Sequence, residues 1–413
     1  MAIQQPQTPH LQIIRRLLLL LAAAVLFTAC CEKKPSPEPI PSGTVEQTHL
    51  MYMPWSDNLT SYFRVNIDDM ASVIAAGIDD GVRVLVFFMD ETSTGSLTGS
   101  LFELQRAGSQ CVRRTIRDYE APIDFTTTAG IASILGDVKA EAPARRYTMS
   151  IGSHGMAWLP VASQTKAPER SSLPRRKEYW EYAAPDRPLT RWFGGVNVAN
   201  RTEIQTLAEA LTQAGMHMDY ILFDDCYMSS VEVAYDLRHV TDYLIGSTSE
   251  IMAYGFPYAL AGEHMLGAVN YEGICDAFHN FYSNYEFPYG TIGVTCCAEL
   301  DDLADIMRRI NTSCTFDSAQ VGELQRLDGY SPALFFDMGD YVHHLCTDAA
   351  LLDEFERQLA RTVPWHRHTD YYYSMSNGRN PIYTFSGITT SDPSVDPEIV
   401  IDRQQTAWYR ATH

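Results

Sequence analysis

The amino-acid sequence predicts an α/β protein in which helices cover both faces of a mostly parallel sheet. Residues 82–90, VRVLVFFMD, form the near-continuous apolar run that is typical of a strand buried on both faces. Apolar runs of this kind alternate along the chain with segments of helical spacing. Because such alternation favours parallel strands joined by crossover helices, we expect a three-layer α/β/α sandwich.

The elements of this sandwich follow one another in regular order. Threonines near the start of 125–143 are suited to cap a helix, and Gly215 stops the next one. Residues 101–116 are expected to form a short polar hairpin region. The expected strands are 48–55, 82–90, 145–155, 218–226, 242–250 and 291–300, and the expected helices are 59–77, 125–143, 201–215, 231–240, 300–310 and 351–362.

The first 30 residues are expected to be a secretion signal and no part of the fold. Two arginines precede an apolar run at 17–27 that is too short to span a bilayer. The following TACC resembles a bacterial lipobox, which implies lipidation of Cys30 and a lipoprotein anchored to the membrane of the cell envelope. Soluble export remains the alternative, because Phe27 is not the commonest residue at its position.

Composition excludes some classes of function. The 413 residues carry a formal net charge of −20, and the pI is near 4.9. This surplus of acid argues against nucleic acid as a partner. The nine cysteines match no zinc spacing, so no metal site is predicted. Cys296 and Cys297 lie in the apolar run 291–300 and are interpreted as inert core thiols.

Candidate catalytic groups stand where two predicted strands end. His154 lies at the end of strand 145–155, and Cys226 closes strand 218–226. In parallel sheets of this kind, reactive groups collect at the carboxyl ends of the strands. If the two strands are neighbours, about 5 Å apart, both side chains share one crevice. A lone Cys or His is more often a loop or core residue, but the pair at one sheet edge points to thiol catalysis.

The pair has the chemistry of an acyl-transfer site. We expect Cys226 to stand at a helix N-terminus, where the helix dipole favours the thiolate. Its backbone N–H and that of Gly155 could receive the oxyanion that forms during acyl transfer. His154 is suited to move a proton, either from the thiol or to the leaving amine.

Two segments resemble a known family. SIGSHG (150–155) and FDDCYMSSVEVAYDL (223–237) resemble the histidine and cysteine motifs of the clostripain family of cysteine peptidases, of the type exported as lipoproteins. The pair Asn58-Leu59 and later blocks at 331–342 and 385–391 resemble other parts of that family, so the resemblance extends over 45–413. It implies a caspase-like fold in which Cys226 is the nucleophile and His154 the general acid/base.

The resemblance also implies an organisation and a set of partners. Residues 45–299 would be the peptidase core and 300–413 a C-terminal region packed on it, behind the signal segment 1–30 and a Pro-rich tether at 31–44. We expect a monomer that takes a peptide or protein substrate and contacts the membrane through its anchor. Some relatives bind calcium, but no EF-hand spacing is present, so calcium stays open, without assigned residues, and no other cofactor is expected.

Members of the family generally cleave after Arg or Lys, and the resemblance extends this preference to the chain. Asp224 matches the position that pairs with the substrate's cation. It must point away from the sulfur or be offset by the helix dipole, because a carboxylate opposes thiolate formation. Alternation along the strand sends Asp225 to the opposite side, where it is expected to bond a loop or cap the helix. Glu250 is a second candidate for the pocket wall, with a solvated loop acid as the alternative.

The segment between the two motifs, residues 166–188, is polar and basic. It is either a solvated surface loop or an activation loop that is cut after Arg175, Arg176 or Lys177. Two rival functions also remain open at this stage. One is an anchored protein that binds peptides without turnover, and the other is a peptidase with a non-basic specificity.

Overall fold

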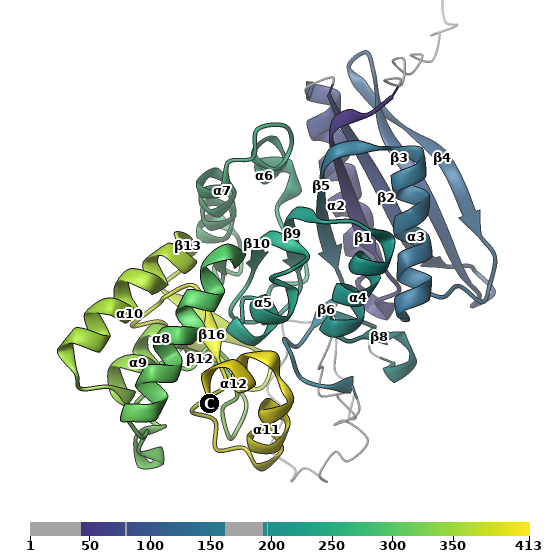
Figure 1. Cartoon of the computed structure of the whole chain (residues 1–413). Coiled ribbons are helices and arrows are strands. Elements are labelled where there is room, and N and C mark those ends of the chain that lie inside the picture. The colour runs from purple at the N-terminus through teal and green to yellow at the C-terminus, as the bar shows by residue number, and fades with distance from the viewer. Residues whose placement is uncertain (1–42, 79–80, 162–192, 196) are drawn as a thin grey trace, which may run out of the picture.

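A nine-stranded mixed sheet forms the centre of the described part of the molecule (Figure 1). The computed structural model describes residues 43–78, 81–161, 193–195 and 197–413, and the strand order is β13-β11-β10-β9-β5-β1-β2-β3-β4. The strands are β1 Val45–Met53, β2 Val82–Glu91, β3 Leu97–Ala107, β4 Gln110–Tyr119, β5 Ala144–Gly152, β9 Met218–Asp224, β10 Thr241–Gly246, β11 Thr291–Cys296 and β13 Trp365–His368. The central strands β2, β1, β5, β9 and β10 are parallel, and antiparallel pairings add the outer ones. The predicted mostly parallel sheet is confirmed.

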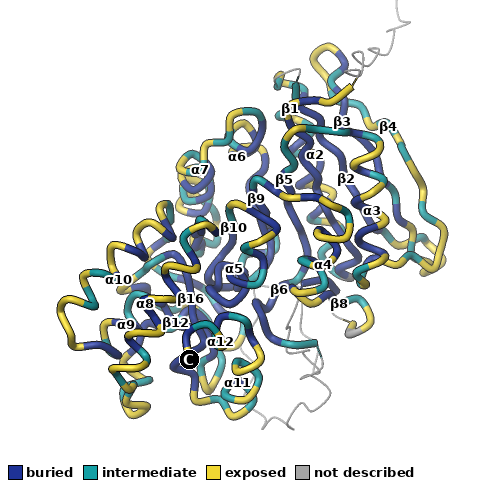
Figure 2. Tube along the Cα trace, in the orientation of Figure 1, coloured by how far each residue is buried: buried dark blue, intermediate teal, exposed yellow. Residues whose placement is uncertain are grey.

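Helices cover both faces of this sheet, as the alternation along the chain predicts (Figure 1). One face carries α2 Thr60–Ala76, α6 Tyr258–Met265 and α7 Tyr271–Asn284, and the other carries α3 Thr128–Glu141, α4 Ile204–Ala214, α5 Val231–Leu237 and α8 Leu300–Ser313. Along β1, Leu50 and Tyr52 enter the apolar cluster under α3 and α4, whereas Met51 and Met53 enter the cluster under α2 and α6. Figure 2 shows the central strands buried and the outer sides of the helices exposed.

Local sequence signals set several element ends. The Thr127 side chain accepts a hydrogen bond from Gly130 N at 3.1 Å and caps α3. Gly215, with φ 60°, ends α4 in the left-handed conformation. The expected hairpin at 101–116 is larger than predicted, because β3 and β4 extend the main sheet by two long antiparallel strands.

Residues after 300 pack on the sheet and complete one of its edges. Strand β13 pairs with β11, and the helices of this region share the apolar cluster of α5. Figure 1 shows the region in green and yellow beside α5 and β10. Its further elements are β12 Phe336–Asp337, α9 Met338–Leu345, α10 Ala349–Thr362, β14 Tyr371–Ser374, β15 Gly378–Pro381, β16 Thr389–Thr390, α11 Pro397–Asp402 and α12 Ala407–Thr412.

Several predicted features lie outside the described residues. These are the signal segment with Cys30, residues 31–42 of the tether, and the segment with Arg175, Arg176 and Lys177. Within the described ranges, no helix is both long and apolar enough to cross a membrane.

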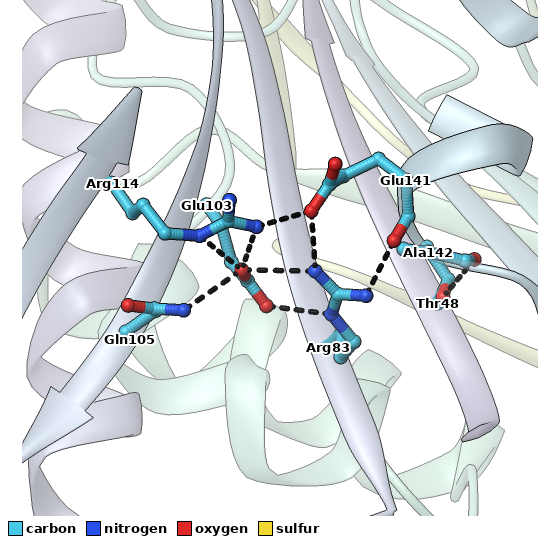
Figure 3. Close-up of polar contacts among 7 residues, drawn as sticks. All are labelled: Thr48, Arg83, Glu103, Gln105, Arg114, Glu141 and Ala142. Atoms are coloured by element: carbon cyan, nitrogen blue, oxygen red, sulfur yellow. Dashed lines mark hydrogen bonds and ion pairs between the residues drawn. The ribbon is translucent and has the colours of Figure 1, made fainter. Parts of the chain in front are cut away.

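A buried ion-pair network ties the amino end of β2 to β3, β4 and the end of α3 (Figure 3). Arg83 is 4% exposed and its Nε lies 2.7 Å from Glu103 Oε1, while Arg114 Nη2 lies 2.7 Å from Glu103 Oε2. Arg83 Nη1 also donates to the carbonyl oxygen of Glu141 at 2.7 Å. Burial alone would raise the pKa of Glu103, but hydrogen bonds from Arg83 and Arg114 more than offset it, so that pKa is lowered. The network holds the sheet together at the end opposite to the strand ends discussed below.

Arg83→Met should destabilise the fold, because it leaves the Glu103 carboxylate buried with one partner fewer. The expected loss is about 3 kcal/mol of the free energy of unfolding, measured by urea denaturation at pH 7. Arg357→Met is the control: its pair with Asp353 is exposed on one helix, and we expect a loss of about 0.5 kcal/mol or less. Equal losses for the two variants would contradict this account of the network.

Candidate active site

His154 and Cys226 follow the ends of two adjacent parallel strands. Strand β5 lies beside β9 (Figure 1), and Gly152 is opposite Asp224 at the last register position. His154 and Cys226 each come two residues later in the chain. The condition on which the shared crevice depended, that the two strands are neighbours, is therefore met. Both residues are partly exposed as whole residues.

The two strand ends are in direct backbone contact. A Cβ placed on Gly155 would lie 2.6 Å from both the Asp225 Cβ and the Cys226 carbonyl oxygen, and 3.1 Å from Cys226 N. Contacts this short leave room for glycine alone. Asp225 adds a second tie, because its Oδ1 accepts a hydrogen bond from Ser153 N at 2.5 Å. Asp225 thus bonds the loop before His154, one of the two roles expected for it.

The surroundings of Cys226 differ from the expected helix N-terminus. Helix α5 starts at Val231, and Cys226 lies in a turn five residues earlier. The prediction that the helix dipole favours the thiolate is therefore wrong, because the dipole acts only within the first turn of a helix. Burial, and then the nearby Glu250 carboxylate, raise the pKa of the Cys226 thiol. The N–H of Ile251, 3.4 Å from Sγ, opposes this rise.

Tyr227 shapes the turn that presents Cys226, and no local sequence pattern predicts this conformation. Its φ of 63° lies in the left-handed region, which is unfavourable for a bulky residue. Tertiary contacts hold it there: the ring stacks on Phe335 with centroids 5.0 Å apart, and the hydroxyl donates to Glu250 Oε1 at 2.8 Å. The turn is therefore fixed by residues far away in the chain.

His154 contacts Asn58, a residue that stood out in the sequence only through its resemblance to the clostripain family. His154 Nε2 lies 2.8 Å from Asn58 Oδ1. Asn58 belongs to the short 3₁₀ helix Asp57–Leu59, which follows β1, the other sheet neighbour of β5. A polar residue just after the adjacent parallel strand was the available signal for this contact.

Asp224 is a buried carboxyl group that makes no hydrogen bond of good geometry to any described residue. It is 2% exposed, and neither of its side-chain oxygens has a partner of hydrogen-bond geometry among the described residues. Burial raises its pKa to about 8, although the nearby Phe256 backbone and Tyr258 hydroxyl lower it in part. Gly255, with φ 76°, faces the carboxylate so closely that a Cβ there would lie 2.6 Å from Oδ1. This side of β9 is opposite to Asp225, so Asp224 contributes least to the pKa of the thiol.

Glu250 is held by a dense set of donors. Its Oε1 accepts from the hydroxyls of Tyr227 and Ser374, each at 2.8 Å, and its Oε2 accepts from Met375 N at 3.0 Å. The side chain is buried, so the alternative of a solvated loop acid is wrong. Glu250 joins the turn of Cys226 to the C-terminal hairpin of β14 and β15.

Other reactive side chains do not gather into a second site in the described ranges. No group of three His, Cys, Asp or Glu residues there could hold a metal ion. Calcium remains an expectation without assigned residues. The cysteines from 111 to 346 within those ranges are free thiols; Cys297 is buried, and Cys296 is partly exposed at the end of β11.

A mostly parallel α/β/α sheet that brings a cysteine and a histidine together at adjacent strand ends has the architecture of a caspase-like cysteine hydrolase. Comparisons with known proteins agree. The model of the clostripain family, Peptidase C11, matches residues 179–331. A secreted C11 cysteine protease from Bacteroides thetaiotaomicron, called iotapain, is 50% identical over 90% of this chain and 100% of its own, with a TM-score of 0.81. The chain therefore belongs to the clostripain family and is a cysteine protease, as predicted.

Further relatives place the chain within that family. A clostripain from Bacteroides thetaiotaomicron ATCC 29148, solved with a peptide inhibitor, is 58% identical over 54% of this chain and 99% of its own, with a TM-score of 0.53. An inactive zymogen C11 protease from Parabacteroides distasonis is 26% identical over 91% of this chain and 100% of its own, with a TM-score of 0.73. A comparison with curated proteins gives no significant match.

Gly155→Ala should reduce activity sharply, because the new Cβ forces the ends of β5 and β9 apart. A displacement of about 1 Å between reacting groups costs on the order of 100-fold, so we expect such a fall in kcat/KM on a fluorogenic peptide. Gly136→Ala is the matched control, since a Cβ there meets no atom within 4 Å. Full activity of Gly155→Ala would show that the contact does not position the site.

Proposed function

We propose that this protein is an exported endopeptidase that cleaves after Arg or Lys, with Cys226 as nucleophile and His154 as general acid/base. The observation that carries the proposal is the backbone contact of Gly155 with Cys226, which puts both side chains at one edge of the sheet. His154 takes the thiol proton while the sulfur attacks the peptide carbonyl. It then gives that proton to the leaving amine, and water hydrolyses the thioester.

The backbone N–H groups of Cys226 and Gly155 are the proposed oxyanion donors. Cys226 N lies 3.1 Å from the position of a Cβ on Gly155, so the two amides are close in space. The developing negative charge would meet fixed dipoles there, which need no rearrangement during the reaction. Because the resting thiol has a raised pKa, proton transfer to His154 accompanies the attack in this proposal.

Asp224 is the proposed partner of the substrate's cation. A buried carboxylate without donors is costly, and a guanidinium or ammonium group supplies the donors and the opposite charge. The inhibitor bound to the 58% identical clostripain is written BTN-VLTK-AOMK, so a lysine stands next to its AOMK group. Glu250 is kept as part of the pocket wall, where its carboxylate adds negative potential from a fixed position.

Export, anchoring and processing form the second part of the proposal. Two similar proteases are described as secreted, which supports export of this chain, and Cys30 is the proposed site of lipidation. One relative is described as an inactive zymogen. Two solved relatives match only 54% of this chain while 99% and 96% of their own length is covered, as expected of cleaved chains. These observations support cleavage next to Arg175, Arg176 or Lys177.

Asp224→Asn should remove the preference for basic substrates. On fluorogenic peptides with Arg, Lys, Asp, Asn or Leu at the cleaved position, we expect the wild type to prefer Arg and Lys. The variant should lose roughly 10–150-fold in kcat/KM on these two, the value of a charged hydrogen bond of about 1.5–3 kcal/mol. Asp242→Asn, at an exposed position of β10, is the control. A wild type that prefers Leu or Asn would overturn the basic specificity.

Binding of a cation beside Asp224 should depend on pH. The raised pKa of Asp224, about 8, means that a cation must displace a proton below pH 8. Inhibition by benzamidine should therefore strengthen from pH 6 to 8, by at most about tenfold per unit, and level off above. Asp224→Asn should abolish that rise.

Storage of purified protein should convert the wild type into two chains, whereas Cys226→Ala stays whole. Mass mapping should place the cut after Arg175, Arg176 or Lys177, and a basic chloromethyl ketone should label Cys226 in the wild type alone. The triple variant Arg175→Ala, Arg176→Ala, Lys177→Ala serves as the control for the position of the cut. An intact wild-type chain with full activity would rule out processing, and cleavage of Cys226→Ala at the same rate would assign it to another protease.

A further inference from the structure

Three neighbouring strands, in the order β9-β5-β1, present side chains at the same edge of the sheet. Cys226 follows β9, His154 follows β5, and Asn58 follows β1. The contact between Asn58 Oδ1 and His154 Nε2, at 2.8 Å, has the length of a strong hydrogen bond. The two residues are 96 positions apart in the chain, so the pairing of β1 with β5, and not the local sequence, brings them together.

We propose that Asn58 is a positioning residue that fixes the orientation and the tautomer of His154. An amide oxygen accepts, so the imidazole places its proton on Nε2 and a lone pair on Nδ1. This inference rests on the proposed roles of His154 and Cys226. It adds that Nδ1 is the atom through which the proton moves: the S–H bond of Cys226 breaks, an N–H bond forms at Nδ1, and the same proton later passes to the leaving amine.

The chain on either side of Asn58 is anchored in both cores. Trp55, two residues after the end of β1, is buried in the cluster under α3 and α4, and Leu59 packs against the cluster under α2. The short segment between β1 and α2 therefore crosses the edge of the sheet with both ends held. The side-chain amide of Asn58 therefore needs no further ordering before it accepts a hydrogen bond from His154, as a positioning residue requires.

A neutral partner suits the charges around this edge. Three acids, Glu250, Asp225 and Asp224, lie near the Cys226 thiol, and each of them raises the pKa of that thiol. A carboxylate at position 58 would be a fourth acid at this edge. It would hold the protonated His154 ring too firmly for the ring to release its proton. An amide orients the ring and adds no charge.

Three variants test the inference: Asn58→Leu, which removes the acceptor, Asn58→Asp, which keeps it and adds charge, and Asn284→Ala as a control on the exposed end of α7. Asn58→Leu should lower kcat by about 10–100-fold with KM within twofold, because general acid–base catalysis contributes about 10²–10⁴-fold and only its alignment is lost. In Asn58→Asp, activity should return as the pH rises above neutral. The limb of the pH–activity profile that His154 governs should move to higher pH by about one unit. Thermal unfolding of each variant separates these effects from loss of folding.

A direct reading of the tautomer accompanies the kinetics. In ¹⁵N-histidine spectra, the His154 signals, identified by their absence from His154→Ala, should show the proton on Nε2 in the wild type and a mixture of tautomers in Asn58→Leu. A proton on Nδ1 in the wild type, or wild-type kcat and pH profile in Asn58→Leu, would overturn the inference. Full activity of Cys226→Ala would instead overturn the proposed catalytic roles, so the two failures are distinguishable. If Asn58→Leu does not fold, Asn58→Asp still decides through its pH profile.

Discussion

The contact between the ends of β5 and β9 is the constraint on which the active site depends. Parallel strands lie about 4.8 Å apart, and here the backbone of Gly155 touches the backbone of Cys226 just past the last paired residues. Asp225 reinforces the contact through its bond to Ser153 N, although its carboxyl is fully buried and burial, with the charge of Asp224, raises its pKa well above the usual range. The sheet thus brings His154 and Cys226 to the same edge, and the contacts of Tyr227 hold the turn that presents the thiol.

The electrostatics of the site follow from the same arrangement. Side chains alternate along the end of β9, so Asp224 faces one side, Asp225 the other, and the thiol lies beyond both. The resting thiol is neutral because burial and Glu250 oppose its charge, and the Ile251 N–H offsets only part of this. If a substrate cation pairs with Asp224, as proposed, it takes the place of the proton that the raised pKa keeps on this carboxyl group below pH 8.

The sequence predicted the central sheet, its helices and the neighbouring positions of His154 and Cys226, because these follow from periodicity along short stretches. The helix expected at 231–240 does start at Val231, but Cys226 was wrongly placed at its N-terminus, because the chain between them makes a left-handed turn at Tyr227. No local signal marks a tyrosine for that conformation, which Phe335 and Glu250 enforce from a distance. The Asn58 contact was missed because a polar residue just after β1 becomes a signal only when β1 is known to lie beside β5.

The turn that carries Cys226 also shows why residues after 300 are part of the catalytic unit. Its backbone bonds the segment after β10 through Tyr227 N to Ser249 O at 3.0 Å, and it bonds the C-terminal region through Thr389 N to Ser229 O at 3.0 Å. Without that region, the buried Glu250 would lose the Ser374 and Met375 donors, and Tyr227 would lose the ring of Phe335. An unsatisfied buried carboxylate beside a strained turn is costly. Residues 45–299 alone would therefore hold the sheet but not the geometry of the nucleophile.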